Sequence, residues 1–217
     1  MPENIIRCAW TGEDELYQKY HDFEWGRPVH DDTALFELLI LEGMQAGLSW
    51  ITILRKRENF RRAFDHFNID KVLGYDEQKI ESLLQDAGII RNRRKIEATI
   101  HNAKAFREVQ KEHGSFDAFL WSYVGGKSIQ NQWRTVSEAP ATTELSDRIS
   151  KDLKKRGFKF VGSTIIYALM QSMGMVNDHT TDCFVYHEIC AHIRMIPLEN
   201  KYKWRGTGMD EMQIYTH

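Results

Sequence analysis

The sequence predicts an all-α protein. Apolar residues recur at intervals of three and four along most of the chain, which is the spacing that gathers them on one face of a helix. No segment alternates apolar and polar residues convincingly enough to predict a strand. Glycines and capping residues divide the periodic stretches into helices of ordinary length.

The first long periodic stretch runs from Asp32 to Phe64 and predicts two helices. Asp32 or Thr33 can cap its start, because short polar side chains accept hydrogen bonds from the free amides of a first turn. Gly43 and Gly47 offer a break near the middle. We therefore expect one helix before these glycines and another after them.

Two further helices are expected in the middle of the chain. An amphipathic stretch opens at Asp76 and stops at Gly88, and a long helix follows over 89–114. Gly114 is a suitable stop residue, because glycine adopts the left-handed conformation that ends many helices. Residues 115–126 predict a shorter helix.

The last predicted helices flank a short turn. Residues 144–156 run into Gly157, and an apolar helix is expected over 163–174, with Ser163 or Thr164 as its cap. Beyond about residue 187 the periodic pattern decays. We expect residues 188–217 to form an irregular tail.

Composition favours one compact domain. The 217 residues are 42% apolar and 12% aromatic, which is enough to build a sizeable core, and no stretch rich in proline, serine or glycine marks a linker. No apolar run is long enough to cross a membrane, and the amino end lacks the pattern of a signal peptide. Three cysteines cannot form a disulfide framework. We expect a soluble cytoplasmic protein with reduced thiols.

The overall charge argues against a general attraction to nucleic acid. Twenty-nine Lys and Arg residues against 31 Asp and Glu give a net charge of -2, so DNA binding would need a local basic face. Three basic clusters exist, at 55–57, 91–95 and 151–159. Each is also compatible with an ordinary solvated helix face.

Two pairs of residues near opposite ends of the chain resemble metal ligands. Cys8 and His21 lie near the amino end, while His179 and Cys183 are four residues apart, on one face if that stretch is helical. Together they would complete a tetrahedral Cys2His2 zinc site. Each pair alone also fits ordinary packing, and a rival set lies nearby, so spacing leaves the ligands open: the rival residues are His187, Cys190 and His192.

The turn between the last two helices has the features of a phosphate site. Gly157 can take the left-handed backbone that ends the first helix. Gly162 lets the backbone approach a ligand where the second helix exposes its free amides, and Lys159 adds positive charge. An ordinary turn between packed helices would have the same glycines.

Glu42 stands in unusually apolar company, between a run of leucines and isoleucine and the break that precedes Trp50. A buried carboxylate is costly unless something pairs with it, so Glu42 is a candidate ligand contact. The alternative is an exposed carboxylate at a helix end. Aromatic residues gather in the same first part of the chain, where they could line a pocket or belong to the core: Trp10, Tyr17, Tyr20, Trp25 and Trp50.

Longer strings in the sequence carry a family resemblance. They are RCAW, YHDFEWG, LFELLILEGMQAGLSWITILRKRENFRRAF, QDAGIIRNRRKI, LKKRGFKFVGSTIIYALMQSMGMVNDH and HTTDC. Over roughly residues 7 to 186 the chain closely resembles the type I 3-methyladenine DNA glycosylases, a zinc-containing branch of the helix-hairpin-helix glycosylases. The resemblance implies two helical lobes around a cleft, within one glycosylase domain over 1–187, and a zinc site that joins the amino- and carboxyl-terminal regions.

The resemblance also implies an activity. Proteins of this family hydrolyse the N-glycosidic bond of 3-methyladenine in alkylated double-stranded DNA, so the expected partner is that DNA. A monomer with no nucleotide cofactor is expected. A zinc-stabilised DNA-binding protein without catalysis is the alternative, and a metal-dependent hydrolase is disfavoured because no His-Glu-x-x-His string is present.

Carried over by position, the resemblance assigns roles to individual residues. One structural zinc ion per chain would be held by Cys8, His21, His179 and Cys183. The methylated base would be bound by Trp10, Tyr17, Tyr20, Glu42 and Trp50. Glu42 and Tyr20 are the candidate catalytic residues. The hairpin residues that would contact the DNA backbone are Gly157, Lys159, Gly162 and Ser163.

The chain departs from the superfamily at one position that matters for catalysis. Many helix-hairpin-helix glycosylases have a catalytic Asp in a Val-Asp-x-His string, and here Asn177 occupies the place of that Asp. Acid-base assistance from this position is therefore in doubt. Asp178 lies one residue further on, and the sequence gives it no role.

Overall fold

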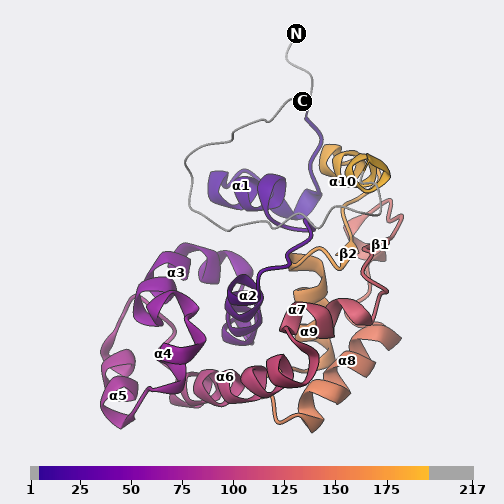
Figure 1. Ribbon diagram of the computed structural model, residues 1–217. Coiled ribbons are helices and arrows are strands. Elements are labelled where there is room, and N and C mark those ends of the chain that lie inside the picture. Colours follow the sequence, from indigo (N-terminus) through magenta and orange to yellow (C-terminus); the bar gives the residue numbers. More distant parts are fainter. Residues whose placement is uncertain (1–4, 196–217) are drawn as a thin grey trace, which may run out of the picture.

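The computed structural model describes residues 5–195 and is mostly helical (Figure 1). Its α-helices are α1 (Glu15–Phe23), α2 (Asp32–Gln45), α3 (Trp50–Ala63), α4 (Ile69–Leu73), α5 (Glu77–Gln85), α6 (Arg93–His113), α7 (Phe116–Ser122), α8 (Glu144–Lys155), α9 (Ser163–Ser172) and α10 (Phe184–Met195). Three short 3-10 turns lie at Ala9–Thr11, Asp65–Phe67 and Val136–Glu138. None of the helices within 5–195 is long and apolar enough to cross a membrane.

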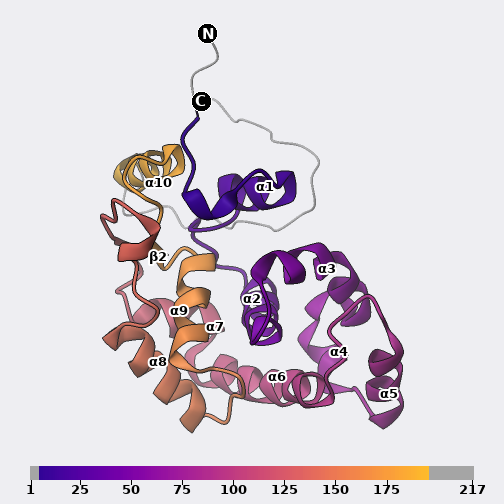
Figure 2. The same cartoon turned by 180° about the vertical axis from the view of Figure 1, so that it is seen from behind.

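Two separate apolar cores divide the helices into two lobes. The larger core lies among α2 to α9 and includes fully buried rings such as those of Phe36, Phe60 and Phe106. The smaller one surrounds Cys8 and Cys183. Figures 1 and 2 show α1 and α10 side by side on one side of the molecule, with the larger lobe on the other. The predicted division into two helical lobes is confirmed.

The predicted break between the first two long helices is confirmed, with a different cap. Asp31 caps α2 by accepting a hydrogen bond from the amide of Ala34, whereas Asp32 accepts from the amides at the start of α7. The helix continues through Gly43. It ends before Gly47, whose φ of +84° is a left-handed conformation that glycine adopts at little cost.

The turn between α8 and α9 is a tight hairpin. Gly157 has a φ of +93°, and its amide and that of Phe158 donate to the carbonyls of Lys154 and Leu153, which ends α8 in a Schellman motif. The predicted caps of α9 are wrong. Gly162 occupies the N-cap position with no side-chain hydrogen bond to the first turn, so the opening amides of α9 have no side-chain partner there.

Two expectations about regular structure are also wrong. The structure has a short parallel pair, β1 (Ile129–Gln130) with β2 (Val176–Asn177), whose two-residue strands are too short to show alternation. The stretch expected to be irregular after residue 187 is helical as far as Met195, because α10 packs its apolar face into the small core. Residues 196–217 of that expected tail lie outside the described residues.

Candidate active site and metal centre

Four buried side chains from both ends of the described chain meet in the small lobe. They are Cys8, His21, His179 and Cys183, and one ligand atom from each lies within 4.8 Å of the others. Separations across the cluster include 3.2 Å between the two histidine nitrogens and 3.4 Å between Cys183 Sγ and His21 Nε2. Zinc bonds of about 2.0 Å to nitrogen and 2.3 Å to sulfur place neighbouring tetrahedral ligands roughly 3.3–3.8 Å apart. The cluster therefore fits a four-coordinate metal ion.

The outer nitrogen of each histidine already has a partner. His21 Nδ1 lies 2.7 Å from Asp22 Oδ1, and His179 Nε2 lies 3.0 Å from the carbonyl oxygen of Trp25. Carboxylates and carbonyls in these positions fix the ring so that the other nitrogen faces a metal. The Asp22 carboxylate also accepts hydrogen bonds from Nε and Nη2 of Arg7. The surroundings thus hold the ligands in a geometry suited to metal binding.

The thiols of Cys8 and Cys183 affect each other's ionisation. The hydrogen bond with Cys8 and those with the two histidines lower the pKa of Cys183 against the opposing effect of burial. The interaction with Cys183, together with burial, raises the pKa of Cys8. Two thiolates this close repel each other unless a cation lies between them, and a bound metal requires both thiols to be deprotonated.

The rival ligand residues lie outside this cluster. Cys190 Sγ is 3.3 Å from Gln130 Oε1, next to the β1–β2 pair, and His187 is exposed. The side chain of His192 lies outside the described part of α10. Gly26 leaves room for the ring of His179, because a Cβ at this position would lie 2.9 Å from His179 Nε2.

The predicted base-pocket residues meet between the two cores. Tyr20 on α1 belongs to the small lobe, and Trp50 at the start of α3 belongs to the larger one; their ring centroids are 5.5 Å apart at an interplanar angle of 45°. The indole N–H of Trp50 is buried and has no acceptor within 5–195. A buried donor of this kind is costly to leave unpaired, so this position favours a hydrogen-bond acceptor.

Glu42 is the most unusual charge in this region. Only 3% of it is exposed, and it takes part in none of the ion pairs among residues 5–195. Burial raises the pKa of its carboxyl to about 8, although hydrogen bonding from Ser172 of α9 opposes the shift. Its charge in turn adds to the effect of burial in raising the pKa values of Tyr17 and Tyr20. The alternative of an exposed carboxylate at a helix end is wrong.

Trp10 packs against the two tyrosines of α1 that lie near Glu42. Its ring centroid lies 4.8 Å from that of Tyr17 and 6.5 Å from that of Tyr20. It also packs edge-on against Trp25, which covers the His179 ring of the metal cluster at 4.6 Å. The metal cluster and the aromatic residues are therefore neighbours, so the folding of one supports the position of the other.

The hairpin between α8 and α9 packs against the last part of helix α2, which carries Glu42 and Gly43. Asn102 of α6 bonds both the amide and the carbonyl of Lys159, at 2.7 and 3.0 Å, which fixes the loop. A Cβ placed on Gly43 would lie 3.3 Å from the Cβ of Phe160, a residue with a φ of +55°. The Lys159 side chain is exposed, whereas the Ser163 hydroxyl is 2.8 Å from that of Ser146.

Hydrogen bonds hold both residues near the position where the superfamily has its catalytic Asp. Asn177 is fully buried and donates through Nδ2 to Gln130 Oε1 at 2.8 Å. Asp178 accepts four hydrogen bonds through its two oxygens, and the donors are Asn131, Trp133, Tyr167 and Gln171. These bonds fasten the segment before His179 to the rest of the fold.

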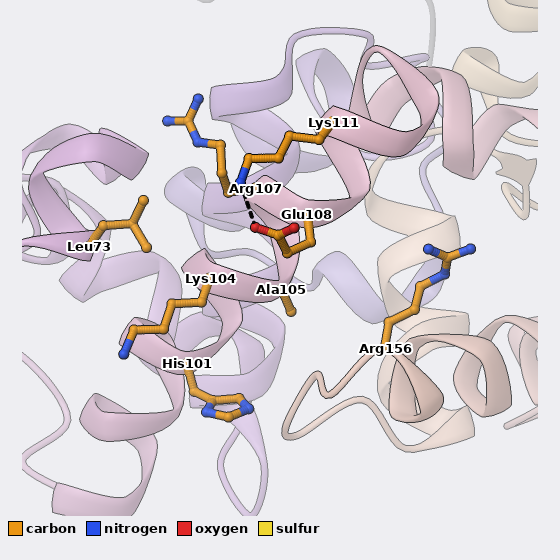
Figure 3. A pocket seen from close by; sticks show the side chains of 8 residues that line it. All are labelled: Leu73, His101, Lys104, Ala105, Arg107, Glu108, Lys111 and Arg156. Atoms are coloured by element: carbon orange, nitrogen blue, oxygen red, sulfur yellow. Dashed lines mark hydrogen bonds and ion pairs between the residues drawn. The ribbon is translucent and has the colours of Figure 1, made fainter.

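A surface groove on α6 lies apart from these residues (Figure 3). Its volume is about 510 Å³, and it is lined by Leu73, His101, Lys104, Ala105, Arg107, Glu108, Lys111 and Arg156. Several of its cations pair with carboxylates, such as Lys111 with Glu108 at 2.7 Å. None of the residues predicted to bind the base lines this groove.

Comparisons with known proteins agree with this arrangement. DNA-3-methyladenine glycosylase 1 of Escherichia coli K12 is 52% identical over 180 residues, covering 83% of this chain and 96% of that protein. A crystal structure of 3-methyladenine DNA glycosylase I has 50% identity and a TM-score of 0.80, covering 82% of this chain and 98% of that one. A variant of such an enzyme, solved in complex with 3-methyladenine, has 38% identity and a TM-score of 0.80, covering 82% and 96%. Residues 10–186 match the methyladenine glycosylase family, and the chain belongs to that family.

Proposed function

We propose that this chain, a DNA-3-methyladenine glycosylase of base-excision repair, selects its substrate through the buried Glu42 and the aromatic residues around it. The observation that carries the proposal is a nearly inaccessible carboxylate with no cationic partner among the described residues, placed beside Tyr17 and Tyr20. Burying such a carboxylate without a partner destabilises the free protein. A ligand that brings positive charge or hydrogen-bond donors offsets this free energy.

The chemistry of the lesion matches this pocket. Methylation at N3 makes the purine of the nucleotide cationic, so the base leaves as a neutral molecule and the glycosidic bond is already weakened. The nucleotide first has to leave the duplex, which costs less for a damaged base than for an intact one. Trp10 or Trp50 can then stack on the cationic ring, and Glu42 can accept hydrogen bonds from its amino group.

Recognition alone does not account for catalysis. Positive charge moves from the base to the sugar as the bond breaks, so holding the cationic base too tightly would raise the barrier. We assign the compensating contribution to a water oriented by Glu42 or Tyr20 and to DNA phosphates held near the sugar. Asn177 and Asp178 take no part, because the β1–β2 pair and the four donors around Asp178 already use their polar atoms.

We assign zinc to the cluster of Cys8, His21, His179 and Cys183 and give it a structural role. Thiolate and imidazole ligands in a set of four are typical of structural zinc. Four protein ligands leave no open position at which the ion could activate water. When bound, the ion would supply a cross-link between the amino-terminal segment and the segment before α10.

Base release from methylated DNA tests the catalytic function directly. The purified protein is expected to release 3-methyladenine without added metal or nucleotide, as seen by chromatography of the liberated bases. A brief chelator treatment that leaves the fold intact should leave this activity unchanged. Loss of activity in still-folded protein would contradict a structural metal, and a complete lack of release would favour a DNA-binding role without catalysis.

The hairpin prediction concerns Gly162, where the opening amides of α9 offer a phosphate site. A Cβ at this position meets no atom within 4 Å, so Gly162→Asp fits sterically, and Asp is a good N-cap residue. The variant should keep its stability and lose about tenfold or more in affinity for damaged and undamaged duplexes alike, because its charge repels the phosphate. Fluorescence anisotropy of labelled duplexes measures this.

Gly162→Asn is the matched control, because it provides a similar cap without the negative charge. It should bind DNA much better than Gly162→Asp. If the Asp variant folds and binds both duplexes as wild type does, the hairpin only packs and does not hold the DNA backbone.

A further inference from the structure

Both ends of α1 are tied to α3 by ion pairs. Asp14, the N-cap residue of α1, accepts a hydrogen bond from Arg55 at 2.6 Å. Glu24, at the other end of the helix, receives two hydrogen bonds from the guanidinium of Arg57, one of them at 2.9 Å. Because α1 carries Tyr17 and Tyr20 while α3 begins at Trp50, these two pairs span the region between the lobes where the base is proposed to bind.

The two ion pairs differ in their surroundings. The Arg55 side chain is 62% exposed, whereas that of Arg57 is only 15% exposed. Burial would lower the pKa of Arg57, yet the hydrogen bond and charge of Glu24 keep it above its usual value. A bidentate contact such as that between Arg57 and Glu24 has a defined geometry. A single exposed contact such as that between Arg55 and Asp14 is readily exchanged for contacts with water. The Glu24–Arg57 pair is therefore the one able to set the position of α1.

Arg57 lies close to the pocket residues in sequence and in space. It is two helical turns after Trp50 on α3, which places both on the same face of that helix. Its charge acts on Tyr20, one turn before Glu24 on α1. Both Trp50 Nε1 and Arg57 Nε are buried donors with no acceptor in the described chain, so the hydrogen bonds of the Arg57 side chain there are those to Glu24.

We infer that Arg57 is a positioning residue for base recognition: its paired contact with Glu24 fixes α1 on α3 and so sets the spacing between Tyr20 and Trp50. This inference rests on the assignment of these aromatic residues to the base pocket. The contact does not touch the base, and it acts by holding one wall of the pocket against the other. Loosening it should weaken base binding before it affects the metal cluster or the hairpin.

Replacing Arg57 by methionine removes the pair and keeps much of the side-chain volume. Affinity for free 3-methyladenine, measured by calorimetry, is expected to fall about tenfold, since small displacements of positioned groups have effects of this size or larger. Affinity for undamaged duplex and the metal content per chain should stay as in wild type. Arg57→Lys keeps the charge with a less specific contact and should recover part of the affinity.

Arg55→Met is the matched control, because it removes the exposed pair at the other end of α1 and should leave base affinity unchanged. The double variant Glu24→Gln with Arg57→Met removes the unpaired Glu24 charge that the single variant leaves behind. Under our inference, the double variant recovers stability but still binds the base weakly. Recovery of both would show that Arg57 only balances the charge of Glu24.

Two outcomes separate this inference from the pocket assignment itself. If Trp50→Ala and Tyr20→Ala weaken base binding while Arg57→Met lowers only the melting temperature, Arg57 has a purely structural role and the inference is wrong. If the aromatic substitutions also leave base binding unchanged in folded protein, the base binds elsewhere and the pocket assignment fails with it.

Discussion

Cys183→Ala is expected to abolish metal binding and to lower the free energy of unfolding by at least about 4 kcal/mol, because binding energy in a closed metal site is also folding energy. The substitution leaves a buried histidine pair and one thiol where the ion would lie. The segment before α10 would then lose its link to Cys8, near the amino end. Metal analysis of the purified protein and chemical denaturation measure the two effects.

Cys190→Ala is the control for this experiment. Cys190 lies beside Gln130 and Asn177, away from the ligand cluster, so its loss should leave the metal content at about one ion per chain. If Cys190 proves necessary for the metal and Cys183 does not, the ligand assignment is wrong. Equal destabilisation by both substitutions, with metal retained, would mean that the thiols contribute through packing.

Periodicity predicted the long helices because each has an apolar face and a clear stop. The 89–114 helix ends at Gly114 as expected, although it starts only at Arg93, where Asn92 caps the first turn through its side chain. The helix α1 was not predicted. Its buried residues are Tyr20, His21 and Asp22, whereas the apolar Leu16 and Phe23 are exposed, so the spacing of apolar residues does not mark the buried side of this helix.

The metal ligands show what spacing can and cannot decide. Cys8 and His21 are separated from His179 and Cys183 by most of the chain, and only the folded structure brings them together. Spacing alone left a second set open, and the family resemblance was needed to choose between the two. The partners that hold the histidine rings, Asp22 and the Trp25 carbonyl, had no signal in the sequence.

The burial of Glu42 could be anticipated from its neighbours, whereas its partners could not. The apolar run before it places the carboxylate against the core, but the approach of Tyr17, Tyr20 and Ser172 depends on how α1 and α9 pack around α2. The roles of Asn177 and Asp178 were also open at the sequence level. They follow from the short β1–β2 pair, which the sequence did not predict.

Glu42→Gln is expected to stabilise the free protein at high pH. The pKa of Glu42 in the folded state is about 8, above the usual value of 4.5, so the folded protein favours the protonated form. The stability from this protonation is fully present at about pH 4 and is lost as the pH rises through 8. The Gln variant does not titrate. Its free energy of unfolding should match that of wild type near pH 4 and exceed it at pH 8 to 9 by a few kcal/mol, because each unit of pKa difference between the folded and unfolded states corresponds to about 1.4 kcal/mol.

The same substitution should weaken selection of the damaged base. Gln keeps the size and one acceptor oxygen but removes the charge, so preference for the cationic lesion should fall by about 1 to 3 kcal/mol, the usual contribution of a charged hydrogen bond. In wild type the preference should grow as the pH rises towards 8 and Glu42 ionises, whereas the Gln variant should show no such dependence on this group. Affinity for undamaged DNA should barely change.

Single-turnover kinetics at increasing protein concentration separate recognition from chemistry. The concentration at half-maximal rate reports binding of the damaged duplex, and the limiting rate reports bond cleavage. If the Gln variant binds the lesion as tightly as wild type while its limiting rate collapses, Glu42 acts in the transition state and recognition is the wrong role. If neither quantity changes while stability at pH 8 rises, Glu42 is a buried carboxylate without a part in the reaction, and the base must be recognised by Trp10, Tyr17, Tyr20 and Trp50 alone.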